Sequence, residues 1–204
     1  MRKLTTFLPV LFLGVAGALS PATPSLANPI IYTETATASG FLGTIQFTSA
    51  TVTLTMNNDT TNVANPSTGI FDNVQQTLEP LMLTISGIGT TTFTDETQAA
   101  VNQGVPDAGF GDITTNRAIL FTKNATFSTY DLKSAVEPAV SGTAIINSTP
   151  PLSYQTADGA FTLSSVASVS FAATTSTVVP EPASLLLLGT ALAGFGLIRR
   201  REKS

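Results

Sequence analysis

The sequence predicts an all-β fold, an antiparallel β-sandwich or jelly roll, on three observations. Threonine is over-represented, with 34 among 204 residues, and β-branched residues favour strands. Apolar and polar residues alternate with period two, which is typical of strands with one buried face. Clusters of Gly, Pro, Asn and Asp separate the alternating segments. This spacing of short strands and turns favours an antiparallel arrangement over a parallel sheet.

The alternation is clearest in residues 45–47 and 52–56, where apolar side chains alternate with threonine or glutamine. These two strands precede a turn cluster at residues 57–59. Further strands are predicted at residues 81–85, 90–94, 118–122, 126–130, 142–146 and 161–171.

One short helix is predicted at residues 95–101, because Asp95 and Glu96 suit the first turn of a helix. The segments between strands are rich in Gly, Pro, Asn and Asp and are predicted to be loops. The three longest loops are expected at residues 57–69, 102–116 and 147–159.

The N-terminus has the pattern of a secretory signal peptide. Arg2 and Lys3 precede an apolar stretch at residues 7–19, and small residues stand just before Asn28. This pattern predicts export by the secretion machinery, with cleavage between Ala27 and Asn28.

The C-terminus has the pattern of a single membrane helix. Residues 183–198 carry no charge, although a spanning helix usually needs about 20 apolar residues. Arg199, Arg200 and Arg201 follow directly. By the positive-inside rule these arginines are a cytoplasmic basic anchor, so the preceding chain lies on the other side of the membrane.

A proline-rich segment, Val179, Pro180, Glu181, Pro182 and Ala183, precedes this helix. The two prolines fix φ and remove N–H donors, which favours an extended and exposed segment. The order of motif, short apolar helix and arginine cluster resembles the PEP-CTERM sorting signal. The resemblance implies that an exosortase-type membrane processing enzyme recognises these residues. It also implies that the helix holds the protein in the membrane only until processing removes it.

These segments predict the organisation of the chain. The body between them is long enough for one domain. The predicted parts are a signal peptide at 1–27, an exported β domain at 28–173, a linker at 174–179 and the sorting signal at 180–204.

Charge and composition exclude several function classes. Residues 28–182 contain twelve acidic residues against three basic ones, a formal charge of −9. Nucleic acid is therefore not expected as a partner, since phosphate binding needs clustered cations. The chain has no cysteine and no histidine, which excludes a thiol nucleophile, a Ser-His-Asp triad and zinc sites built from these residues.

Carboxylates are the remaining candidates for site chemistry. Asp107 and Asp112 flank the Gly-rich residues 104–111 of a predicted loop and are the candidates for a metal such as calcium or for paired catalytic carboxylates. Loop acids more often serve turns and solubility. The sequence accordingly predicts no metal, no cofactor and no catalysis.

The function expected from the sequence is a structural or adhesive role in the cell envelope or extracellular matrix, with extracellular polysaccharide as a partner. The alternatives are a carbohydrate- or calcium-binding surface module and, on the row of Thr51, Thr53 and Thr55, ice binding. A sugar site usually has flat aromatic faces. Residues 28–182 contain no tryptophan and only Tyr32, Tyr130 and Tyr154 as tyrosines.

Overall fold

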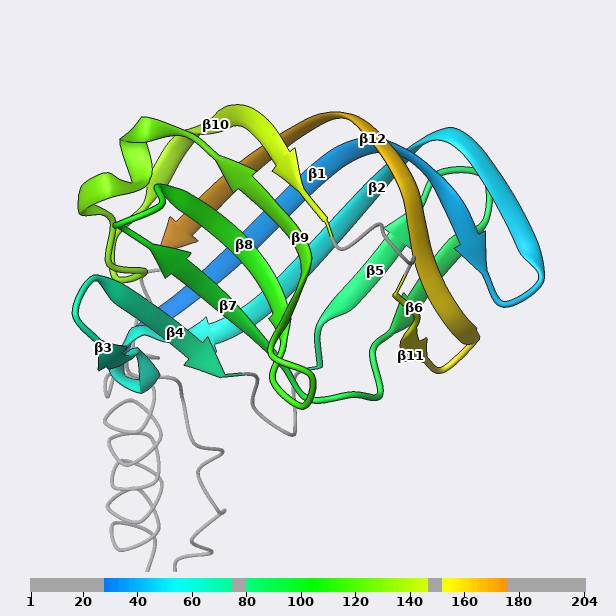
Figure 1. Ribbon diagram of the computed structural model, residues 1–204. Coiled ribbons are helices and arrows are strands. Elements are labelled where there is room, and N and C mark those ends of the chain that lie inside the picture. The colour runs from blue at the N-terminus through cyan, green and yellow to red at the C-terminus, as the bar shows by residue number, and fades with distance from the viewer. Residues whose placement is uncertain (1–27, 75–79, 147–151, 176–204) are drawn as a thin grey trace, which may run out of the picture.

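The computed structural model describes residues 28–74, 80–146 and 152–175 (Figure 1). The predicted signal peptide and sorting signal lie outside these residues, as does most of the predicted linker. Among the described residues, no helix is long and apolar enough to cross a membrane. The predicted membrane helix at 183–198 is outside that range.

The described chain is all-β and antiparallel, as predicted. The strands are β1 (Pro29–Leu42), β2 (Ile45–Asp59), β3 (Ala64–Ser67), β4 (Ile70–Val74), β5 (Met82–Ile85), β6 (Gly89–Thr92), β7 (Thr97–Asn102), β8 (Asp107–Asp112), β9 (Arg117–Lys123), β10 (Val136–Ile145), β11 (Tyr154–Thr156) and β12 (Gly159–Thr175). Two 3-10 helices, η1 (Thr60–Asn62) and η2 (Ala125–Thr129), complete the elements of the described chain.

The strands form one continuous sheet in the order β3-β4-β7-β8-β9-β10-β12-β1-β2-β5-β6, with β11 paired to β12. The long strands β12, β1 and β2 lie side by side at its centre (Figure 1). Strand β10 changes partner along its length, from β12 at Val140–Gly142 to β9 at Thr143–Ile145. This change lets a single sheet curl over its own inner face instead of dividing into two sheets.

The two ends of the curled sheet close in different ways. At the β6 end, Phe93 bridges Thr156, and the Ala157 N–H donates to the Thr92 carbonyl at 2.9 Å. Backbone pairing thus connects β6 through β11 to β12. We call this the bridge-closed end.

At the β4 end, side-chain amides make the connection to β2. Asn58 Nδ2 donates to the Val74 carbonyl at 2.6 Å, and Asn73 Nδ2 donates to the Asp59 carbonyl at 3.1 Å. We call this the amide-closed end. Both closures shield strand edges that would otherwise expose unpaired backbone groups.

The inner face of the sheet holds the hydrophobic core, because alternate residues of each strand point inward. At the bridge-closed end, the Phe161 ring stacks on Phe47 with centroids 6.3 Å apart and meets Phe93 edge-on at 5.9 Å. At the amide-closed end, Phe171 packs against Tyr32, Phe127 and Tyr130. Each end of the sheet therefore has its own aromatic cluster.

Several local predictions are wrong. The helix predicted at 95–101 is instead β7, in which Thr97, Ala99 and Val101 are buried and alternate with more exposed residues. Pairing with β4 on one side and β8 on the other stabilises the strand over the local helix signal. The strand predicted at 126–130 is helix η2, where the Asn124 side chain caps the start by accepting from the Thr126 N–H.

Three boundaries also differ from prediction. The turn cluster at 57–59 continues β2, and the loop predicted at 102–116 contains β8. Strand β12 continues to Thr175, two residues into the predicted linker. Strand β1, at the centre of the sheet, is not among the predicted strands, although its burial alternates residue by residue.

Candidate functional site

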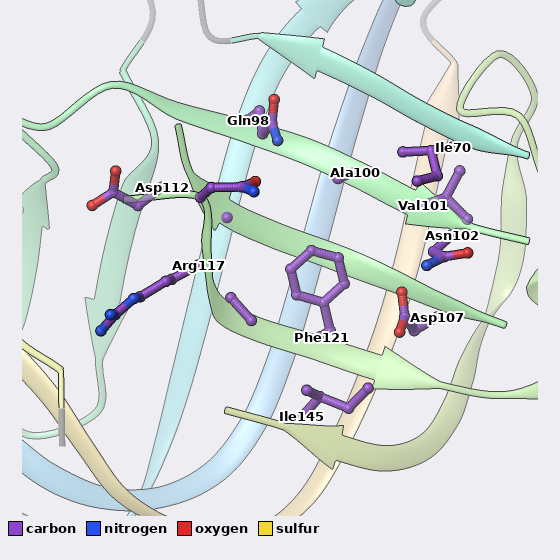
Figure 2. Close-up of a pocket in the computed structure, with 13 residues that line it drawn as sticks. Ile70, Gln98, Ala100, Val101, Asn102, Asp107, Asp112, Arg117, Phe121 and Ile145 are labelled. Atoms are coloured by element: carbon purple, nitrogen blue, oxygen red, sulfur yellow. The ribbon is translucent and has the colours of Figure 1, made fainter. Parts of the chain in front are cut away.

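A groove of about 240 Å³ lies on the outer face of the sheet, across β4, β7, β8, β9 and β10 (Figure 2). The alternation of β7 turns Gln98, Ala100 and Asn102 toward it, because their neighbours face the core. The side chains around the groove mix apolar and polar groups. They include Ile70, Gln98, Ala100, Asn102, Asp107, Asp112, Asn116, Arg117, Phe121 and Ile145.

Strand β8 contains two glycines, Gly109 and Gly111, and Gly111 lines the groove. Gly109 is opposite Phe121 in the β8–β9 register. A Cβ on Gly109 would collide with the Leu120 carbonyl and would lie 2.6 Å from Glu34 Oε2. Only glycine fits here, because a Cβ would collide with the β9 backbone and with the buried Glu34 carboxyl.

The Phe121 ring covers this glycine strand. Its Cε2 and Cζ atoms lie 3.8 and 3.9 Å from the position that a Cβ on Gly111 would take. Figure 2 shows the ring in the middle of the groove, with Asn102 and Asp107 to one side and Asp112 and Arg117 to the other. Phe121 is half-buried, so the ring packs on β8 and also contributes to the groove wall.

Asn102 and Asp107 face each other across β7 and β8 at one end of the groove. Asn102 Oδ1 accepts from the backbone N–H groups of Gly104 and Val105 at 2.9 and 3.1 Å, which leaves the two Nδ2 hydrogens directed away from that turn. Burial raises the pKa of Asp107 to about 6, although Lys123 opposes the shift. The carboxyl is therefore mainly ionised at neutral pH and accepts hydrogen bonds.

Asp112 and Arg117 are paired in the register at the other end of the groove. Asp112 Oδ1 accepts from the Thr115 N–H at 3.1 Å and so fixes the turn between β8 and β9. This end therefore combines a structural carboxylate with a guanidinium of five possible donors.

Asp107 and Asp112, the metal candidates of the sequence, stand at opposite ends of β8. At about 3.3 Å per residue their Cα atoms are about 17 Å apart, whereas one calcium ion binds its oxygens at about 2.3–2.6 Å. The structure does not bring the two carboxylates together. Within the described part of the chain, no group of three or more acidic side chains is placed to hold a metal ion.

The three tyrosines considered as sugar platforms are all buried. Their hydroxyls donate to backbone carbonyls, Tyr32 to Leu132 at 2.6 Å and Tyr154 to Ala118 at 2.5 Å. The aromatic ring that does reach the groove is Phe121, which sequence reasoning missed. Residues 118–121 are all apolar, so alternation does not indicate which of their side chains faces outward.

The threonine row of β2 has a partner row on β1. Thr51, Thr53 and Thr55 pair with Thr37, Thr35 and Thr33 on the outer face. The strands that carry them curve strongly (Figure 1), and twist is intrinsic to such sheets.

Glu34 lies on the inner side of the sheet, beneath β8 and β9, and is completely buried. Its Oε1 accepts from Thr122 Oγ1 at 2.8 Å, while Oε2 has no hydrogen-bond partner. Burial raises the pKa of this carboxyl well above its usual range, and the Thr122 hydrogen bond only partly opposes the shift. Sequence reasoning missed this residue because it belongs to β1, which was not predicted.

Residues 178–201 match the family model of the PEP-CTERM protein-sorting motif. The chain carries a PEP-CTERM sorting motif. The matched segment includes the predicted motif residues 179–183 and the arginines 199–201. The PEP-CTERM motif implies an exported protein that is held transiently in the membrane, processed by an exosortase and directed to the cell surface or beyond it.

The match covers the C-terminal segment alone, and no family model matches the rest of the chain. A search of curated proteins and a search of solved structures each found no match.

Proposed function

We propose that this protein is a structural or adhesive component of the cell envelope or extracellular matrix, delivered by its PEP-CTERM signal and without catalytic activity. The observation that carries the proposal is the position of the matched motif. It begins at residue 178, three residues after the end of β12, a central strand of the body. The sorting signal thus follows directly on the most extensively paired part of the sheet.

The body is attached to both targeting segments at one end. Ile30, at the start of β1, pairs with Thr175, at the end of β12 (Figure 1). The β1–β2 turn lies at the other end of these strands, about 40 Å away as measured along the fourteen residues of β1. A body held at Thr175 would present its far end and its outer faces to the surroundings, as an adhesive protein requires.

The arrangement of acidic residues supports a role without catalysis. The carboxylates of Asp107 and Asp112 are separated by the length of β8, which is more than the roughly 5–10 Å between the two carboxyl groups of glycosidases. Glu34 is sealed inside the core. These three carboxyl groups are therefore placed to stabilise turns and internal packing, and not to carry out acid–base chemistry on a bound substrate.

A carbohydrate-binding surface module is the second candidate, and the groove around Phe121 favours it. Binding sites usually combine an apolar surface with a few convergent polar groups, and the groove offers both. The calcium-binding alternative has less support, because the two candidate carboxylates do not converge.

Mass spectrometry of the protein isolated from its native host tests the sorting proposal. We expect an N-terminus at Asn28 and a C-terminus near residues 180–182, with loss of the apolar segment and the arginines. The double substitution Pro180→Ala and Pro182→Ala should leave the tail intact, because the segment no longer favours an extended conformation. Recovery of wild-type protein ending at Ser204 would contradict processing at the motif.

A deletion strain tests the structural or adhesive role separately. We expect weaker cell aggregation, biofilm formation and polysaccharide retention, each restored by the wild-type gene. Protease added to spheroplasts should digest the β body, because it lies outside the cytoplasm. Unchanged aggregation, biofilm and polysaccharide retention in the deletion strain would count against the role while leaving the sorting result standing.

A further inference from the structure

We propose that the outer-face groove binds a neutral polysaccharide chain, with the Phe121 ring as the stacking surface for a sugar ring. The inference rests on the proposed function, because it specifies the contact through which an exported surface protein would adhere. It assigns a ligand class to a site formed by β4, β7, β8, β9 and β10.

The aromatic ring of Phe121 is placed to contact a ligand in the groove. One side of the Phe121 ring packs over Gly111, at ordinary van der Waals distance from the position of a Cβ there. The ring is therefore held in place without being buried completely. Large flat rings offer apolar contact area with few rotatable bonds, and the C–H groups of a sugar ring present a matching apolar face.

Hydrogen-bonding groups surround the Phe121 ring in the groove. The two Nδ2 hydrogens of Asn102 are not used by the turn that its Oδ1 stabilises. The Gln98 amide and the Asp107 carboxylate also line the groove, the first with donors and an acceptor and the second with acceptors. Sugar hydroxyls both donate and accept, so amides and a carboxylate at the rim suit them.

The charge of the body is strongly negative. Residues 28–182 carry a formal charge of −9, and the groove contains two carboxylates and the guanidinium of Arg117, with Lys123 opposite Asp107 in the β8–β9 register. A polymer rich in uronate, sulfate or phosphate groups would be repelled by this field. The groove also follows the length of β8, from Asp107 to Asp112, which suits a chain of sugar units better than a single one.

Affinity electrophoresis of the full-length protein in detergent tests the proposal. The gels contain dextran, galactomannan or xylan as neutral polymers, or alginate as the anionic comparison. We expect at least one neutral polymer to slow the protein, and alginate to have no effect. Phe121→Ala should raise the Kd for that polymer at least tenfold, which corresponds to about 1.4 kcal/mol.

Two further variants separate binding from folding. Phe121→Leu keeps an apolar cover over Gly111 but removes the flat ring, so it should fold as the wild type does and still lose most of the binding. Phe41→Ala is the matched control, because Phe41 is exposed on the β1–β2 hairpin, outside the groove. We expect its Kd to equal that of the wild type.

Three results would overturn the inference: no retardation by any of the neutral polymers, retardation by alginate alone, or wild-type binding by Phe121→Leu. None of these results depends on cleavage at the sorting motif. A protein that is processed at residues 180–182 but binds no neutral polymer would therefore refute the inference and leave the sorting proposal intact.

Discussion

The two ends of the curled sheet differ in how their interiors are stabilised. The bridge-closed end uses backbone pairing and the packed rings of Phe47, Phe93 and Phe161. The amide-closed end adds buried polar groups to its aromatic cluster, among them Glu34 and Asn73. Apolar packing is insensitive to pH, whereas buried polar groups stabilise only while their hydrogen bonds and protonation states are maintained.

The comparison also concerns function, because the groove lies over the half of the sheet that contains the buried polar groups. A Cβ added to Gly109 would lie 2.6 Å from Glu34 Oε2, so β8, which contributes residues to the groove, passes close to the buried Glu34. A change in the interior at Glu34 can therefore shift β8 and with it the groove. Substitutions at the bridge-closed end should alter stability without changing the groove.

Phe161→Ala should have the largest effect on stability. The ring is fully buried between Phe47 and Phe93, and its removal leaves a cavity that the backbone pairing cannot close. We expect the free energy of unfolding to fall by about 4 kcal/mol, by the same amount at pH 5 and pH 8. Urea denaturation measures this loss, and a loss that varied with pH would show that the bridge-closed end also depends on ionisable groups.

Asn73→Ala should have the next largest effect. The amide joins β4 to the Tyr32 hydroxyl at 2.9 Å and to the Asp59 carbonyl at 3.1 Å. Its removal leaves the Asp59 carbonyl without this donor and should lower the free energy of unfolding by about 2 kcal/mol. Gln46→Ala is the control, because this amide is exposed on the β1–β2 hairpin. An equal loss of unfolding free energy in both variants would show that the amide closure adds nothing to stability.

Glu34→Gln should change how stability depends on pH. Burial raises the pKa of folded Glu34 well above its unfolded value, so the folded state retains a proton that the unfolded state releases. The contribution of Glu34 to stability should be fully present below about pH 4.3 and should be lost by up to about 1.4 kcal/mol per pH unit above it, until the folded pKa is passed. Glutamine keeps the neutral shape and removes this contribution.

The measurement is urea denaturation at several pH values between 4 and 8. The Gln variant should be less dependent on pH than the wild type, and more stable relative to it as pH rises. Glu96→Gln serves as the control because Glu96 is exposed, and its profile should match that of the wild type. Parallel profiles for the wild type and Glu34→Gln would show that the two ends of the sheet respond to pH alike.

Local alternation in the sequence predicted strands where it was regular and uninterrupted. Val52, Leu54 and Met56 are buried in β2, as their alternation with threonine indicated. The same rule failed at β7, because Asp95 and Glu96 gave a local helix signal that cross-strand pairing with β4 and β8 outweighs. Alternation also did not predict which face of the sheet the Phe121 side chain occupies, because Phe121 lies in a run of apolar residues.

The sequence by itself determined the PEP-CTERM sorting motif and the all-β class. A linear, extended motif is recognised from the order of its residues, and strand alternation is a local property of the chain. The tertiary structure alone decided the site. Phe121 lies over Gly111, and Glu34 reaches Thr122 from 88 residues away, because the register of β1, β8 and β9 in the curled sheet brings them together. Register is set by long-range pairing and core packing, which no short stretch of sequence contains.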